Sequence, residues 1–161
     1  MASRAPRRAR STPRAGSRCR CAADARVPVD RAGFESALAL REAIFRAARA
    51  VLRGERPGAP DLRLINLLAA APPVKPRLLG AGRQTRHGDL DSVLATIARS
   101  AIELLGGDDH TRLRGCVGAE CSRMFVDRSR AGSRRWCGMD GCGSRAKAAA
   151  YRRRKRAATT A

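Results

Sequence analysis

Four cysteines in two equally spaced pairs constrain the fold of this chain more than any other feature of its sequence. Cys116 and Cys121 are separated by four residues, Cys137 and Cys142 are also separated by four, and fifteen residues lie between the pairs. Two thiol pairs joined by a hairpin-length segment can place four soft ligands around a tetrahedral zinc ion. Four thiolates fill every coordination position, so the spacing predicts one structural zinc ion with no open position for water.

The residues around these cysteines predict a short β-hairpin followed by a helix. Met124–Val126 has the composition of a strand, 127–132 that of a turn, and Arg134–Trp136 is expected to return as the second strand. The helix is expected to begin near Met139 or Asp140 and to continue to about Ala157, because this stretch is rich in alanine and lacks proline. A module this small cannot bury enough apolar surface by itself and needs the metal as a staple.

The other candidate ligands are interpreted as incidental. Cys19 and Cys21 lie in a segment without periodicity, and His87 and His110 are interpreted as surface residues because four thiols already satisfy a zinc ion. The alternative is that the four paired cysteines are unrelated free or buried thiols. Their symmetric spacing argues against it.

The charge of the chain is high and unevenly distributed. The 161 residues include 34 Lys and Arg and 14 Asp and Glu, a net charge of +20. Residues 1–26 contribute +7, residues 27–110 only +2, and residues 111–161 +11. Such a basic surface favours polyanions, either nucleic acid or an anionic membrane face. The cysteine clustering argues against a secreted disulfide-rich protein.

The sequence contains no apolar run long enough for a membrane span or a signal peptide. We therefore expect a bacterial-type cytoplasmic protein with no membrane partner, in which reduced thiols serve as metal ligands.

The middle of the chain predicts three amphipathic helices. Apolar residues at three- and four-residue steps predict a helix from Asp30 to Arg53, a short second helix capped by Asp61, and a third from Asp89 to Leu105. Residues 72–88 contain three prolines and three glycines and predict an irregular connection, with Leu78 and Leu79 packed on the core. Polar residues on the helices, Arg99 among them, are interpreted as solvated.

These elements predict a mainly α fold with four segments. Residues 1–28 form a disordered basic arm, 29–110 a small helical domain, 111–157 the zinc module and 158–161 a tail. The zinc module is expected to be a stapled β-hairpin plus a C-terminal helix, similar to a treble clef or a zinc ribbon.

The last helix is the predicted nucleic-acid surface. Because it begins inside the metal site, its basic side chains are oriented rather than attached to a loose tail. Lys147, Tyr151 and Lys155 share one face at four-residue spacing. The residues expected to contact phosphates or bases are Arg134, Arg135, Arg145, Lys147, Arg152, Arg153 and Lys155.

The region from about residue 112 to 156 resembles the CGNR zinc finger. The resemblance depends on the cysteine spacing, on Arg134-Arg135-Trp136-Cys137, and on Lys147 and Tyr151. The finger is named for a Cys-Gly-Asn-Arg sequence, which is Cys142-Gly143-Ser144-Arg145 here. Serine keeps a small hydrogen-bonding side chain, so we expect the fold to be preserved without any role peculiar to the amide.

The preceding helices resemble the ABATE domain of stress-induced bacterial transcription regulators. This resemblance uses 40–44 (Leu-Arg-Glu-Ala-Ile), Leu64-Ile65-Asn66 and the helix from Asp89 to Leu105. Family members usually begin with a Phe-Val-Asn-Thr-like stretch, which residues 1–28 do not contain. We interpret residues 1–28 as a wrong start site, a frame shift or a degraded N-terminus, in which case the helical domain lacks part of its core.

The resemblance implies a DNA-binding transcriptional regulator. Its N-terminal domain would sense a small-molecule or stress signal or direct assembly, and its finger would bind DNA. An RNA-binding module and a protein-interaction adaptor remain alternatives, because a basic helix does not by itself choose between these partners. No catalytic residues are assigned and no enzyme activity is expected, because the sequence has no Ser-His-Asp set, phosphate loop or open metal site.

Overall fold

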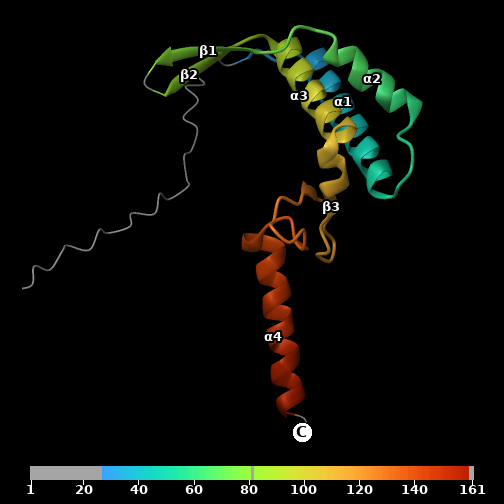
Figure 1. Cartoon of the computed structure of the whole chain (residues 1–161), viewed down its shortest axis with the longest axis vertical. Helices are drawn as coiled ribbons and strands as arrows, with labels where there is room; N and C mark the ends of the chain where they lie inside the picture. The colour runs from blue at the N-terminus through green and yellow to red at the C-terminus, as the bar shows by residue number, and fades with distance from the viewer. Residues whose placement is uncertain (1–26, 81, 160–161) are drawn as a thin grey trace, which may run out of the picture.

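The computed structural model describes residues 27–80 and 82–159, and it confirms the mainly α fold. The predicted arm at 1–28 lies outside this range except for its last two residues, as do Cys19 and Cys21. Four α-helices account for half of the described residues (Figure 1). None of the helices in this part of the chain is long and apolar enough to cross a membrane.

Helices α1 (Arg31–Leu52), α2 (Ala59–Ala69) and α3 (Leu90–Gly106) pack on one another. Asp30 caps α1 by accepting a 2.8 Å hydrogen bond from the Gly33 amide, and Asp89 caps α3 by accepting a 2.9 Å bond from the Ser92 amide. Both helices therefore begin where the sequence predicts. The small core that they enclose consists of Leu40, Ala43, Ala47, Ile65, Ala69, Leu94 and Ala98.

Two predictions about these helices were wrong, and one was incomplete. Asp61 does not cap α2, which begins after Gly58 with a proline in its first turn; instead Asp61 pairs with Arg46 of α1 at 2.6 Å. Arg99 is exposed, as predicted, but its guanidinium also donates to the carbonyls of Ala69 and Ala71 at 2.9 and 3.2 Å and so satisfies the end of α2. Ile97 belongs to the apolar three- and four-residue pattern that predicts α3, but it is 46% exposed and not buried.

The segment between α2 and α3 is a β-hairpin and not an irregular loop. β1 (Lys75–Gly80) pairs antiparallel with β2 (Arg83–His87), and Gly80 and Gly82 adopt φ values of 83° and 72° at the turn. Leu78 and Leu79 do not pack on the core, since they are 78% and 45% exposed. The hairpin projects away from the helices (Figure 1).

The zinc module begins after a 3-10 turn, η1 (Asp108–Arg112). β3 (Leu113–Gly115) pairs antiparallel with β4 (Met124–Val126), a π-helical turn η2 (Met139–Gly143) follows, and α4 (Ser144–Thr159) ends the described chain. The predicted hairpin is thus present, but the prediction of which segment pairs with β4 was wrong. Residues 134–136 form no strand; the carbonyl of Arg135 accepts a 3.0 Å bond from the Val117 amide instead.

Candidate metal centre and nucleic-acid interface

The first cysteine pair lies in the loop that joins β3 to β4. The amide of Cys116 donates to the carbonyl of Arg123 at 2.9 Å and closes this loop. Gly118 leaves room for the opposite ligand, because a Cβ there would lie 3.1 Å from the Cys142 Sγ and 3.2 Å from its Cβ. Glu120 has a φ of 62°, a left-handed conformation that completes the turn before Cys121. A short local loop therefore presents two thiols on one side.

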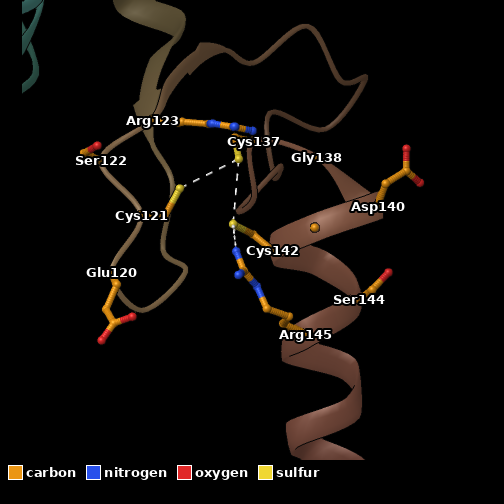
Figure 2. Close-up of a pocket in the computed structure, with 11 residues that line it drawn as sticks. Glu120, Cys121, Ser122, Arg123, Cys137, Gly138, Asp140, Cys142, Ser144 and Arg145 are labelled. Carbon is orange, nitrogen blue, oxygen red and sulfur yellow. Dashed lines mark hydrogen bonds between the residues drawn. The ribbon is translucent and has the colours of Figure 1, made fainter.

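The second cysteine pair comes from the start of the C-terminal helix. Cys137 lies just before η2 and Cys142 lies within it. The amide of Cys137 donates to the Cys116 Sγ at 3.4 Å, which joins the two pairs. The Cys137 Sγ is 3.9 Å from the Cys121 Sγ and 3.8 Å from the Cys142 Sγ, the two contacts that Figure 2 marks between sulfur atoms.

The four sulfur atoms have the spacing of a tetrahedral zinc site. All of them lie within 4.8 Å of one another. A Zn–S bond of about 2.3 Å places the corners of a regular tetrahedron about 3.8 Å apart, which matches the separations of the Cys137 Sγ from the Cys121 and Cys142 sulfurs. In Figure 2 the carboxylates of Glu120 and Asp140 point away from the thiols. The donor set is therefore four sulfurs, as a closed structural site requires.

The thiols also have opposed proton affinities. The backbone amides of Cys137 and Gly118 lower the pKa of Cys116 to about 6. The Arg123 amide lowers the pKa of Cys121, but desolvation and the neighbouring thiols outweigh it and raise the pKa to about 11. Four thiolates this close repel one another, so a bound divalent cation is what allows all four to lose their protons.

The four residues from Cys142 to Arg145 each have a structural role at this centre. Gly143 is buried, and a Cβ there would lie 2.7 Å from the Met139 Sδ. The Ser144 hydroxyl donates to the Met139 carbonyl at 2.6 Å and fastens η2. The Arg145 guanidinium donates to the Cys142 Sγ at 3.4 Å (Figure 2). Serine at position 144 therefore still makes a hydrogen bond that holds the turn.

Comparison with family models covers both halves of the chain. Residues 112–155 match the CGNR zinc finger, and residues 2–108 match the ABATE domain, described as "putative stress-induced transcription regulator". The chain belongs to the ABATE family. No curated protein matched it. The ABATE match includes residues 2–28, which belong to the segment predicted from the sequence to be a disordered arm.

The prediction of one structural zinc ion is confirmed by the CGNR match together with the sulfur geometry. Cys116, Cys121, Cys137 and Cys142 are positioned to hold it. His87 and His110 are exposed and take no part in the cluster. The chain is thus a zinc-binding member of a transcription-regulator family.

Two of the predicted nucleic-acid residues hold the CGNR finger together. Arg134 donates to the carbonyls of Trp136 and Cys137 and lies over the Phe125 ring at 4.6 Å, while Arg145 contacts a ligand sulfur. Arg135 lies over the Trp136 ring at 5.3 Å. Arg134 and Arg145 remain exposed, but replacing either one removes support from the metal centre as well as positive charge.

The other predicted contacts lie on α4. Lys147, Arg152, Arg153 and Lys155 are exposed along a helix that packs on η2 at its beginning and then extends away from the body (Figure 1). Tyr151, on the same face as Lys147 and Lys155, is 62% exposed. α4 has seven basic residues and no acidic one. The helix therefore presents positive charge from a fixed starting point.

Asp127, the buried carboxylate of the finger, has a structural role that was not predicted from the sequence. Asp127 is 3% exposed, and its oxygens accept bonds from the Ser129 hydroxyl at 2.6 Å and from the amides of Ser129 and Arg134 at 2.9 Å. These bonds fold residues 127–134 into a closed loop. The available signal was an aspartate placed two residues before a serine in a turn-rich stretch, a pattern typical of side-chain-closed turns.

Asp127→Asn is expected to lower the thermal midpoint of the zinc-loaded protein, because an amide cannot accept all three hydrogen bonds. The Ser129 hydroxyl and amide, with the Arg134 amide, lower the pKa of Asp127 below its ordinary value. Its stabilising effect is therefore complete above the ordinary aspartate pKa of about 3.9 and is lost only as the pH falls through the lower folded value. The difference in thermal midpoint between wild type and the Asp127→Asn variant should stay constant between about pH 8 and pH 5. Differential scanning fluorimetry over this range measures it.

Asp140→Asn is the matched control for this experiment. Asp140 is an exposed carboxylate of the same finger, so its replacement should leave the midpoint unchanged. An Asp127→Asn midpoint equal to that of wild type would show that the buried carboxylate does not hold the loop.

Proposed function

We propose that this protein is a DNA-binding transcriptional regulator in which a structural zinc ion orients α4 toward the duplex. The observation that supports this most strongly is α4 itself. A sixteen-residue helix is about 24 Å long, and α4 extends for most of that length away from the body, with exposed basic side chains and no carboxylate of its own. Such a helix suits the major groove or a row of phosphates.

The attachment of α4 supports binding over a loosely attached basic tail. Cys142 lies about one helical turn before the first basic residues of α4, Arg145 and Lys147. The side chains of Ser144 and Arg145 are both hydrogen-bonded to the metal-site turn. The helix axis is therefore directed by the zinc centre. Binding and not catalysis is the proposed activity, because four thiolates leave no coordination position for a substrate. A cytoplasmic location belongs to the same proposal.

The ABATE domain supplies a place for the proposed signal. An apolar pocket of about 240 Å³ lies between the C-terminal ends of α1 and α3 and the side of α2. Val51, Leu62, Ile65, Ile102 and Leu105 line it, with Asn66 as a polar member. This volume is below that of a drug-sized site and suits a small apolar molecule.

Replacing Arg152, Arg153 and Lys155 by Gln is the direct test of the proposal. Glutamine keeps the helix propensity of these positions and removes their charge. We expect duplex affinity to fall by at least about tenfold at moderate salt, and the slope of log K against log salt to decrease by roughly 2–3 units, about 0.9 for each lost phosphate contact. Fluorescence anisotropy with the zinc-loaded full chain measures both quantities.

The control variant replaces Arg31, Arg41 and Arg63 by Gln, three exposed arginines of the ABATE domain. It changes the net charge equally and should leave affinity and slope close to wild type. Affinity unchanged in the α4 variant, or binding without salt dependence, would contradict the proposal. Structured RNA that competes better than duplex DNA at equal salt would favour the RNA-binding alternative, and failure to retain either polymer at low salt would favour an adaptor.

A further inference from the structure

The β1–β2 hairpin, residues 75–80 and 83–87, is a basic ribbon that projects from the ABATE domain (Figure 1). Every residue of β1 is exposed, as are Arg83, Arg86 and His87 of β2. Neither face of the ribbon forms an apolar stripe of the kind that packs on a core. The hairpin therefore does not belong to the hydrophobic core of the domain.

The ribbon differs in charge from the helices that support it. Lys75, Arg77, Arg83 and Arg86 give residues 75–87 four positive charges and no negative one. The remaining part of residues 27–110 has eight basic and ten acidic residues. None of the ion pairs found in the described part of the chain includes these four side chains. The near-neutral domain is thus a slightly acidic body with a strongly basic projection.

The ribbon also exposes a large aliphatic side chain near its tip. Leu78 is 78% exposed and pairs with Gln84, so by strand alternation it shares a face with Arg86. Lys75, Arg77 and His87 lie on the opposite face by the same register. One exposed leucine is ordinary on a protein surface. Placed near the end of a cationic two-stranded ribbon, it can make apolar contact with base edges between phosphate-binding groups.

The base of the ribbon is fixed to α3. The amide of Val74, just before β1, donates to the Thr96 hydroxyl at 2.9 Å. Just after β2, a Cβ at Gly88 would lie 2.7 Å from the Ser92 Cβ, so this chain end lies directly against the first turn of the helix. Both ends of the hairpin are therefore held while its tip is free of the domain.

We propose that this ribbon is a second nucleic-acid-binding element, which enters a groove of duplex DNA. The major groove, about 12 Å wide, admits a two-stranded β-ribbon. Lys75, Arg77, Arg83 and Arg86 bind phosphates along the groove, and Leu78 contacts the bases. Three of the four cations are arginine, which suits bidentate phosphate contacts. Two leucines offer too little apolar area to anchor a ribbon in a membrane. The ribbon is separate from α4 in sequence and in fold, so this proposal does not rest on the function of the finger.

The first experiment neutralises the ribbon by replacing Lys75, Arg77, Arg83 and Arg86 with Gln in the zinc-loaded full chain. We expect duplex affinity to fall by at least about tenfold and the salt slope to decrease by roughly 3–4 units. The matched control replaces Arg31, Arg41, Arg56 and Arg63, four exposed arginines of the helical body, and should retain the wild-type affinity and slope. Circular dichroism checks that both variants keep their helices.

The second experiment tests Leu78 separately. Leu78→Ser should weaken duplex binding several-fold without changing the salt slope, because it removes contact with the bases and no charge. Leu67→Ser is the control, since Leu67 is 70% exposed on α2 and lies outside the ribbon. Equal affinity of the Leu78 variant and wild type would show that Leu78 does not contact the bases and would remove that contact from the proposal.

The outcomes distinguish the ribbon from α4. If the α4 variant loses affinity and the neutralised ribbon keeps both affinity and slope, the ribbon proposal is wrong and the finger proposal stands. If only the ribbon variant loses affinity, the finger proposal is wrong and the ribbon proposal stands. Wild-type retention on vesicles containing phosphatidylserine that is lost in the ribbon variant, with duplex affinity unaltered, would overturn the ribbon proposal in favour of a membrane surface.

Discussion

Chelation of zinc is expected to unfold the CGNR finger and leave α1, α2 and α3 folded. Of the apolar and cysteine side chains of the finger that the structure describes, only Leu113 and Cys142 are buried, at 4% and 6% exposure. Such a module has almost no core of its own. Binding of structural zinc to small fingers releases on the order of 10–16 kcal/mol at neutral pH, far more than those few contacts supply.

Cys137→Ser tests the same dependence without a chelator. It removes one ligand whose Sγ lies 3.9 and 3.8 Å from two others. We expect well under one zinc per chain, loss of ordered signals from the finger in NMR spectra, and loss of the contribution of α4 to nucleic-acid affinity. Because α4 begins in the metal-site turn, part of the helical circular dichroism should disappear as well.

The chain provides its own control for the zinc experiment. Replacing Cys19 and Cys21 by Ser removes two thiols of the same chain that the spacing does not assign to the metal. This variant should keep one zinc per chain and the wild-type spectrum. A finger that stays folded after complete zinc removal, or a Cys137→Ser protein with full zinc occupancy, would refute the structural role of the metal.

Leu40→Ala should destabilise the helical domain by about 2–5 kcal/mol, the range for large buried aliphatic side chains cut to alanine. Leu40 is 1% exposed and is the one large side chain fully buried among the described residues. Its neighbours in the core are mostly alanines, which cannot refill the space. Because small domains have only a few kcal/mol of net stability, most of the native population should be lost on mild warming.

Urea unfolding of the zinc-loaded protein, followed by helical circular dichroism, measures this change. Leu67→Ala is the control, since Leu67 is 70% exposed on α2 and its truncation should change the free energy of unfolding by no more than about 0.5 kcal/mol. Zinc content should stay at one per chain in both variants. A change below about 1 kcal/mol for Leu40→Ala would mean that the three helices are not held by this core.

Local patterns predicted the starts of the helices well. Asp30 and Asp89 precede long apolar periodicities, and a cap depends only on the next three residues. Asp61 has the same residue type in a similar position, yet it pairs with Arg46, fifteen residues earlier in the chain. Gly58 and Pro60 let α2 begin sooner, which left the Asp61 carboxylate available to the neighbouring helix.

Strand pairing was harder to predict than helix formation. Met124–Val126 was recognised as a strand, but its partner is Leu113–Gly115 and not Arg134–Trp136. Both candidates are short, and composition does not say on which side of β4 the chain returns. The Cys116–Arg123 bond and the closed loop around Asp127 decide it, and both depend on positions that only the folded finger brings together.

The sequence alone determined the metal ligands and the family, because zinc ligation depends on the identity and short-range spacing of four cysteines. Only the tertiary structure decided which basic residues hold the finger, as Arg134 and Arg145 do, and which project from it along α4. It also showed that a proline- and glycine-rich connection forms an exposed two-stranded ribbon with Leu78 near its tip. These outcomes follow from contacts between distant residues, and the linear pattern of charge and hydrophobicity does not record them.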